Sequence, residues 1–173
     1  RYSLQKLDKP VTLQEELDHI REYVTIQQAR FRDRIRFDLH IEASVLHQQI
    51  PALTIQPLVE NAFLHGVKDM EDGAVIALTL SRTGTDVQIE ISDNGKDMPE
   101  ETRLSALRLE GGAESGGSTG LGMRNVFKRL QLFYGKEGMV EIGSSNGQGT
   151  AITIRIPARK ESERTDVSVV DRG

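Results

Sequence analysis

The first regular pattern along the chain is an apolar seam with alternating spacings of four and three residues. It comprises Leu13, Leu17, Ile20, Val24, Gln27 and Phe31. This spacing is typical of one face of an α-helix, and Thr12 with Glu15 three residues later has the form of a capping box. We therefore predict a helix from Leu13 to about Arg32. Its seam should pack against another part of the protein, because a lone helix buries nothing on its own.

Alternating apolar and polar residues predict a set of strands that each bury one face. The segments with this period-two pattern are 35–41, 75–80, 87–91, 139–142 and 151–156. Residues 83–86 have the composition of a hairpin connection between the second and third of these strands. Pro157 ends the last one.

Three further stretches have the composition of helices. They are residues 54–66, 100–109 and 121–134. In the first, Pro57 lies near the start, where proline is tolerated, and Gly66 suits the end. Gly135 is the predicted C-terminal cap of the last helix.

Two polar stretches have no such periodicity. Residues 109–119 contain four glycines among Ser, Glu and Ala, and we predict a mobile segment there. The charged tail over residues 158–173 has little to bury and is predicted to be disordered.

Composition and charge narrow the class of protein. Of the 173 residues, 37% are hydrophobic and 28% charged, as in a soluble globular protein. The formal net charge of -4 argues against nucleic acid as the main partner. The absence of cysteine excludes disulfides, a cysteine nucleophile and thiolate metal sites. No apolar run approaches the roughly 18 residues of a membrane helix, and the start at Arg1 without a signal peptide indicates a fragment of a longer protein.

Three segments carry residues that packing alone explains poorly. In the first, Asn61 and His65 lie four residues apart and therefore on one helical face, with Glu60 beside them. The alternative is a polar rim on an amphipathic helix. In the second, Asp93 ends an apolar strand just before Gly95, where a carboxylate can accept a hydrogen bond from an amine in a pocket, or can belong to a plain turn.

The third segment is Ser118-Thr-Gly-Leu-Gly-Met-Arg-Asn125, at the predicted start of a helix. Glycines at a helix start let backbone N–H groups approach an anion, and the helix dipole favours negative charge there. A lone Gly-x-Gly is weak evidence, so the order of all three segments matters more than any one of them.

Together the segments resemble the nucleotide site of the GHKL ATPases. The shared order is an Asn-bearing helix, Asp-x-Gly after a strand, a polar lid, Gly-Leu-Gly at a helix start, and Gly-x-Gly-Thr before a final strand. Within that superfamily, the sequence from Pro51 to Gly66 (PALTIQPLVENAFLHG) and the preceding region resemble the LytS/YesM type of bacterial sensor histidine kinase. The resemblance covers residues 1 to about 157.

The resemblance implies an α+β two-layer sandwich with a mixed, mainly antiparallel sheet, helices on one face, and one N-terminal helix. It also implies a division of the chain. Residues 1–33 would be the C-terminal part of the dimerisation and phosphoacceptor region, and residues 34–157 the ATP-binding catalytic domain.

The resemblance further implies an ATP site that works with Mg²⁺. The implied cofactor-binding residues are Glu60, Asn61, His65, Asp93, Gly95, Met98, Thr119, Gly120, Leu121, Gly122 and Thr150. Asn61 would hold the metal against the phosphates, while Glu60 and His65 would line the phosphate side. Asp93 would accept the adenine amino group, and Gly95 would let the backbone approach the base.

The remaining motif residues would complete the same implied site. Thr119 to Gly122 would close over the phosphates, and Thr150 would support the adenine end. In hydrolytic relatives a Glu four residues before the box Asn activates water; here that residue is Pro57, so phosphoryl transfer fits better than hydrolysis. On this interpretation we expect no catalytic residue in the fragment. Glu60 is the one residue that stays a candidate for such a role.

The resemblance implies a sensor histidine kinase whose phosphoacceptor His lies upstream of Arg1 and whose phosphoryl group passes to an Asp of a response regulator. The full-length protein would be a homodimer with a cytoplasmic kinase domain, attached to the membrane through a segment outside this chain.

Two departures from the family pattern bear on affinity. Asp97 stands where the first glycine box usually has its second Gly, and we expect its strain and charge to weaken ATP binding. Leu64 stands where relatives often have a Lys. Two other functions therefore stay open: a nucleotide-poor GHKL interaction or dimerisation module, and a hydrolytic GHKL ATPase.

Overall fold

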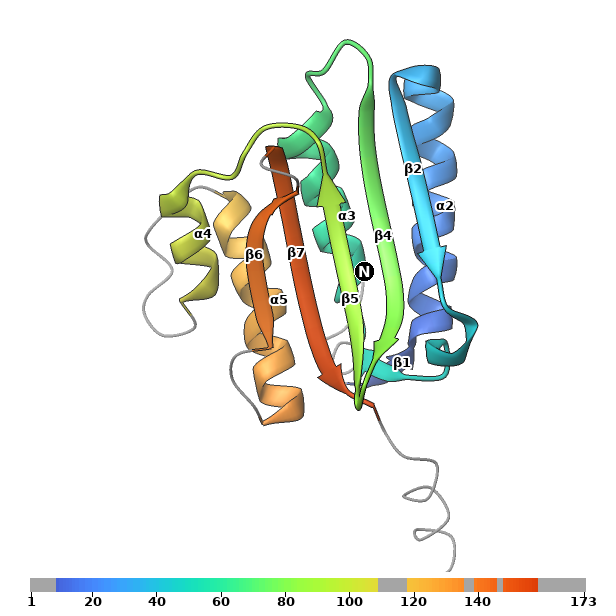
Figure 1. Cartoon of the computed structure of the whole chain (residues 1–173), viewed down its shortest axis with the longest axis vertical. Helices are drawn as coiled ribbons and strands as arrows, with labels where there is room; N and C mark the ends of the chain where they lie inside the picture. The colour runs from blue at the N-terminus through green and yellow to red at the C-terminus, as the bar shows by residue number, and fades with distance from the viewer. Residues whose placement is uncertain (1–8, 109–117, 136–138, 146–147, 159–173) are drawn as a thin grey trace, which may run out of the picture.

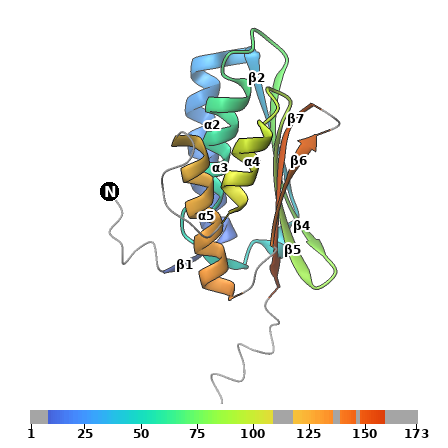
Figure 2. The same cartoon turned by 90° about the vertical axis from the view of Figure 1, so that its left-hand side faces the viewer.

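The computed structural model describes residues 9–108, 118–135, 139–145 and 148–158. Within these residues the chain forms two layers, with all the α-helices packed on one face of a sheet, as the turned view shows (Figure 2). The two-layer sandwich implied by the resemblance is confirmed. The predicted mobile segment lies largely outside the described residues, and so does nearly all of the predicted disordered tail.

The main sheet has five strands in the order β2-β4-β5-β7-β6 (Figure 1). The strands are β2 (Ile35–Ile41), β4 (Ala74–Thr83), β5 (Asp86–Asp93), β6 (Val140–Ser145) and β7 (Gln148–Pro157). β2 runs parallel to β4, and the other pairs are antiparallel. Each predicted strand is present, and most of them are longer than the alternation suggested. The register places Asp93 directly opposite Thr150 at the end of β5.

The helices that cover the sheet match the predicted ranges with two differences. They are α2 (Leu13–Phe31), α3 (Ile55–Asn61), α4 (Glu100–Leu107) and α5 (Ser118–Tyr134). α5 begins three residues earlier than predicted. α3 continues as a π-helical segment, η3 (Ala62–Val67), so Gly66 lies inside the helical segment instead of ending it. Such π-helical turns are frequent at functional sites.

α2 shares the hydrophobic core of the sheet. The Thr12 hydroxyl accepts a hydrogen bond from the Glu15 N–H at 3.2 Å, as the capping pattern predicted. Leu13, Leu17 and Ile20 are almost completely buried in the same core as the inner face of the sheet. The boundary between residues 33 and 34 stays a prediction, since α2 and the sheet pack as one body in this structure.

A small second sheet lies at the start of α2. β1 (Pro10–Thr12) pairs with β3 (Gln49–Pro51) in antiparallel register. The sequence does not predict these strands, because three residues are too few for an alternating pattern to appear. None of the described helices is long and apolar enough to span a membrane.

Candidate functional site

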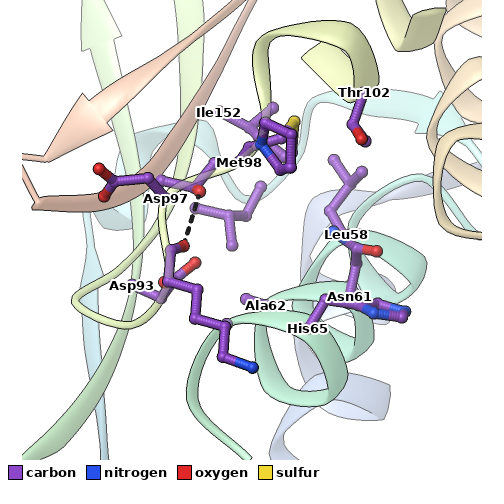
Figure 3. A pocket seen from close by; sticks show the side chains of 14 residues that line it. Leu58, Asn61, Ala62, His65, Asp93, Asp97, Met98, Thr102 and Ile152 are labelled. Carbon is purple, nitrogen blue, oxygen red and sulfur yellow. Dashed lines mark hydrogen bonds between the residues drawn. The ribbon is translucent and has the colours of Figure 1, made fainter.

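A cavity of about 360 Å³ lies between the α3–η3 helix and the C-terminal end of β5. It is lined by Leu58, Asn61, Ala62, His65, Gly66, Ile91, Asp93, Lys96, Asp97, Met98, Pro99, Thr102, Thr150 and Ile152. Figure 3 shows Leu58, Asn61, Ala62 and His65 of the helix on one side, with Asp93 across from them and with Met98 and Thr102 above. Five of the residues that the sequence predicted for the site therefore line one cavity: Asn61, His65, Asp93, Met98 and Thr150.

Asp93 is the buried carboxylate of this cavity, with only 6% of its surface exposed. Its Oδ1 accepts the Gly95 N–H at 2.9 Å. Burial raises the pKa of Asp93 to about 6, the backbone N–H groups of Gly95 and Thr150 oppose this shift, and the charge of Asp97 adds to it. The carboxylate can therefore act as a charged hydrogen-bond acceptor for a ligand at neutral pH, and it becomes a neutral, weaker acceptor in mild acid.

Glycine backbone surrounds Asp93 too closely for side chains. A Cβ on Gly66 would lie 2.7 Å from Asp93 Oδ1, and one on Gly95 would lie 1.9 Å from the Gly66 carbonyl oxygen. Gly149 has a φ of 76°, and a Cβ there would lie 2.0 Å from the Asp93 carbonyl oxygen. The sequence predicted Gly95 as a close approach, whereas Gly66 was expected only to end a helix. Gly95 is not itself among the lining residues. It affects the cavity indirectly, because its N–H donates to the lining residue Asp93.

Asn94 holds the turn after β5 in place. Its Oδ1 accepts the Val75 N–H at 2.8 Å, and its Nδ2 donates to the Gly73 carbonyl at 2.8 Å. The side chain thus ties the turn to the start of β4. The sequence indicated a turn here but gave no signal for this contact.

Asp97 is exposed, and its carboxylate binds backbone on the far side of the turn. Its Oδ1 accepts the Gly149 N–H at 2.6 Å, and Figure 3 shows the carboxylate turned away from Leu58 and Asn61. In the described residues the non-glycine positions with positive φ are Arg32 and Leu53. The expected backbone strain at Asp97 is therefore wrong, because this position does not use the left-handed region. The charge still acts on the site by raising the pKa of Asp93.

Asn61 and His65 lie on the cavity face of the α3–η3 helix, as their spacing predicted. Asn61 is half-buried, and its Nδ2 donates to Met123 Sδ at 3.7 Å, which leaves the amide oxygen as the atom suited to a metal ion. No group of three or more ionisable metal ligands occurs in the part of the chain that the structure describes.

Glu60 lies on another side of the same helix and is not among the cavity-lining residues. It accepts a hydrogen bond from Gln56 Nε2 at 3.1 Å. The pKa of Tyr23 on α2 rises to about 12, chiefly through burial and secondly through the charge of Glu60. Glu60 thus lies close to α2. Leu64 is half exposed and also does not line the cavity.

The predicted phosphate-binding glycines fall at the start of α5. Thr119, Gly120 and Leu121 belong to its first turn, and their side chains lie outside what the structure describes. Among the residues that the structure describes, and apart from its own helix backbone and chain neighbours, no atom lies within 4 Å of a Cβ added at Gly122. The apolar lining residues Leu58, Ala62, Ile91 and Ile152 were not predicted for the site, although each lies on the apolar side of a predicted element.

Comparisons with known proteins agree with this geometry. Residues 50–160 match the family described as histidine kinase-, DNA gyrase B-, and HSP90-like ATPase, and residues 1–35 match the family described as histidine kinase. Sensor histidine kinase YesM of Bacillus subtilis is 37% identical over 151 residues, covering 87% of this chain and 24% of YesM. Sensor histidine kinase BtsS of Escherichia coli K12 is 33% identical over 162 residues, covering 94% of this chain and 26% of BtsS. The chain thus spans about a quarter of these relatives.

Solved structures share the fold. The catalytic domain of histidine kinase ThkA superposes with a TM-score of 0.62 at 16% identity, covering 87% of this chain and 95% of the ThkA domain. Mycobacterial sensor histidine kinase MprB gives a TM-score of 0.58 at 23% identity, covering 87% of this chain and 99% of the MprB chain. At these identities the structures support the architecture alone. The sequence matches carry the assignment: the chain belongs to the sensor histidine kinase family and contains its ATP-binding catalytic domain.

Proposed function

We propose that the cavity binds Mg-ATP and that the domain transfers the γ-phosphoryl group to a histidine of the full-length protein outside this chain. The phosphoryl group then passes to an aspartate of a response regulator. In the same proposal the full-length protein is a homodimeric sensor, anchored in the membrane outside this chain, with this domain on the cytoplasmic side.

The single observation that carries the proposal is the buried Asp93 in a cavity walled by glycine backbone. A buried carboxylate next to apolar walls suits a flat, apolar ring with an amino group, since the amine satisfies the carboxylate and the ring covers Leu58, Ala62 and Ile152. Asn61 lies on the facing helix, where an oxygen ligand would reach Mg²⁺ bound to the phosphates. His65 lines the same side.

Transfer is favoured over hydrolysis by the residue one turn before Asn61. Pro57 has no group that can take a proton from water, and it lies in the first turn of α3. Without a base in that position, phosphoryl transfer depends on how the substrate histidine and the nucleotide are placed.

The test is calorimetric titration of Mg-ATP into the wild-type chain and into Asp93→Asn. The amide can still accept one hydrogen bond but loses the charge, so we expect affinity to fall by an energy of about 1–3 kcal/mol. Asp86→Asn, at the other end of β5, is the matched control and should bind like the wild type. If the wild type does not bind Mg-ATP, the domain is a nucleotide-poor interaction module; equal losses in the two variants would remove Asp93 from the site.

A further inference from the structure

The α3 helix begins without a cap of its own. Thr54 precedes its first residue, but the Thr54 hydroxyl donates to the Pro51 carbonyl at 2.6 Å and does not bind the first-turn amides. Pro57 has no N–H to satisfy. The other amides at the start of the helix need acceptors from elsewhere.

Glu16 on α2 supplies that acceptor from a distance of 38 residues in sequence. Its side chain is 2% exposed, and its Oε1 accepts the Thr54 N–H at 2.7 Å. The Ile55 N–H also binds this carboxylate; burial raises the pKa of Glu16, and these two backbone hydrogen bonds oppose the shift. A carboxylate at this end of α3 is favourable for the helix dipole as well.

Arg129 on α5 holds the residues just before Thr54. Its guanidinium donates to the carbonyl oxygens of Ala52 and Leu53. Leu53 has a φ of 57°, a conformation that a bulky side chain adopts only when its surroundings impose it. Two buried or half-buried charged side chains, from α2 and α5, therefore fix the backbone of residues 52–54. We call this backbone segment with Glu16 and Arg129 the 52–54 junction.

The junction joins the elements that carry the phosphate end of the cavity. The start of α2, the start of α3 and the second half of α5 lie together at one end of the helical layer, beside β1 (Figure 1). Asn61 is six residues from the start of α3, about 9 Å along the helix. A short helix moves as a rigid unit, so a shift of its first turn displaces Asn61. In contrast, Asp93, Gly95 and Gly149 are held by β5, the turn after it and β7, and Gly66 alone of the three glycines around Asp93 lies on the helical segment.

We propose that Glu16 and Arg129 are positioning residues of the nucleotide site, which set the place of α3 and α5 around the phosphates and Mg²⁺ without touching the ligand. This inference rests on the proposed function. It also assigns α2 a part in nucleotide binding, because the carboxylate that fixes α3 belongs to α2.

The test compares two ligands on the full chain. Mg-ATP uses both ends of the cavity, whereas adenosine without metal uses the adenine end alone. For Glu16→Gln, which keeps the side-chain size but presents an NH₂ group to one of the two backbone donors, we expect Mg-ATP affinity to fall about tenfold in calorimetry. Adenosine affinity, followed by NMR titration, should fall only about twofold, because Leu58 and Ala62 lie on the displaced helix whereas Asp93 stays in place on β5. Glu15→Gln, an exposed neighbour on α2, is the matched control and should leave both affinities unchanged.

Arg129→Lys provides an independent arm, because it keeps the charge but removes the fork that reaches two carbonyl oxygens. It should reproduce the selective loss of Mg-ATP affinity, and its control is the exposed neighbour Lys128→Arg. If Glu16→Gln does not fold, the affinities of Arg129→Lys for the two ligands test the positioning role.

The other possible results of these titrations contradict either the positioning role or the proposed function. An unchanged Mg-ATP affinity in the folded Glu16 or Arg129 variant, or an equal loss for both ligands, would overturn the positioning role. A wild type that fails to bind Mg-ATP would refute the proposed function itself, and that result comes from the wild-type titration before any variant is compared.

Discussion

The two ends of the cavity are built in different ways. At the end that we propose for adenine, called the adenine end below, Asp93 is held by Gly95, two residues away, and by the paired strand that carries Thr150. At the end that we propose for the phosphates, called the phosphate end, Asn61 lies on a helix whose start is bound by Glu16 and Arg129, far away in sequence. One end is set by a short motif and a strand register, and the other by tertiary contacts.

This difference explains which end a mutation is expected to disturb, and how. Changes in the glycine wall alter the shape of the adenine end directly, because backbone atoms there lie within contact of one another. Changes at the phosphate end act through the position of a helix, so they reach the adenine end only through Leu58, Ala62 and Gly66 and leave Asp93 in place. The comparison is therefore testable with ligands that use one end or both.

The largest expected effect is that of Gly95→Ala. The new Cβ would lie 1.9 Å from the Gly66 carbonyl oxygen, so either the turn or η3 must move. Overpacking of this kind costs about 1–3 kcal/mol; at the middle of that range, we expect a loss of affinity of about thirtyfold for both Mg-ATP and adenosine. Calorimetry for Mg-ATP and NMR titration for adenosine measure the two.

The matched control is Gly143→Ala on β6, where φ is not positive and no described atom other than those of its chain neighbours lies within 4 Å of an added Cβ. It should bind both ligands like the wild type. If Gly95→Ala spared adenosine, the adenine end would not be the rigid region that the comparison requires.

The same contrast accounts for what the sequence could predict. Helices and strands followed from periodicity, because each buries one face of a single core. Asp93, Gly95 and Asn61 followed from motif order. No local pattern predicts the π-helical turn at Ala62–Val67 or the hydrogen bond from the Gly149 N–H to Asp97. Both depend on contacts between segments that are far apart in the sequence. Glu16 looked like an ordinary charged residue of a helix, and only its burial shows its role as an acceptor for α3.

A second effect is a pH dependence confined to the adenine end. Burial, the largest cause, raises the pKa of Asp93 from 3.8 to about 6, so the carboxylate is almost fully ionised at pH 7.5 and about one tenth ionised at pH 5. The protonated form keeps a neutral carbonyl oxygen as an acceptor but loses the charge that strengthens the proposed hydrogen bond from the adenine amine. We expect adenosine affinity to fall about tenfold between these two pH values.

Unfolding driven by Asp93 does not explain such a loss. A carboxyl group whose pKa is raised in the folded state stabilises the fold below its unfolded value, and this contribution is lost as pH rises through about 4 to 6. Acid therefore favours the folded state at this residue while it weakens binding. An adenosine affinity that does not change from pH 7.5 to pH 5 would contradict the assigned role of Asp93.

Asn61→Ala tests the phosphate end alone. It removes one oxygen ligand, an interaction of about 1 kcal/mol, so Mg-ATP affinity should fall about fivefold. Metal-free adenosine should bind as before, because Asp93 and the glycine wall are untouched. Parallel titrations of the two ligands separate this result from damage to α3, which would lower both affinities.

The smallest effect concerns Asp97, where a hydrogen bond and a charge act in opposite directions. Its carboxylate holds the Gly149 N–H at 2.6 Å beside the Asp93 backbone, while its charge raises the pKa of Asp93. Asp97→Asn keeps an acceptor and removes the charge, so the pH midpoint for adenosine binding should move down and the affinity at pH 7.5 should stay within about twofold. Asp97→Gly loses this part-buried hydrogen bond, worth about 0.5–1 kcal/mol, and should weaken binding about threefold. This is the reverse of the tighter binding that the family pattern predicted for a glycine. Titrations of adenosine across pH with both variants test the two contributions separately, and a Gly variant that binds more tightly than the Asn variant would show that the Asp97–Gly149 contact does not support the site.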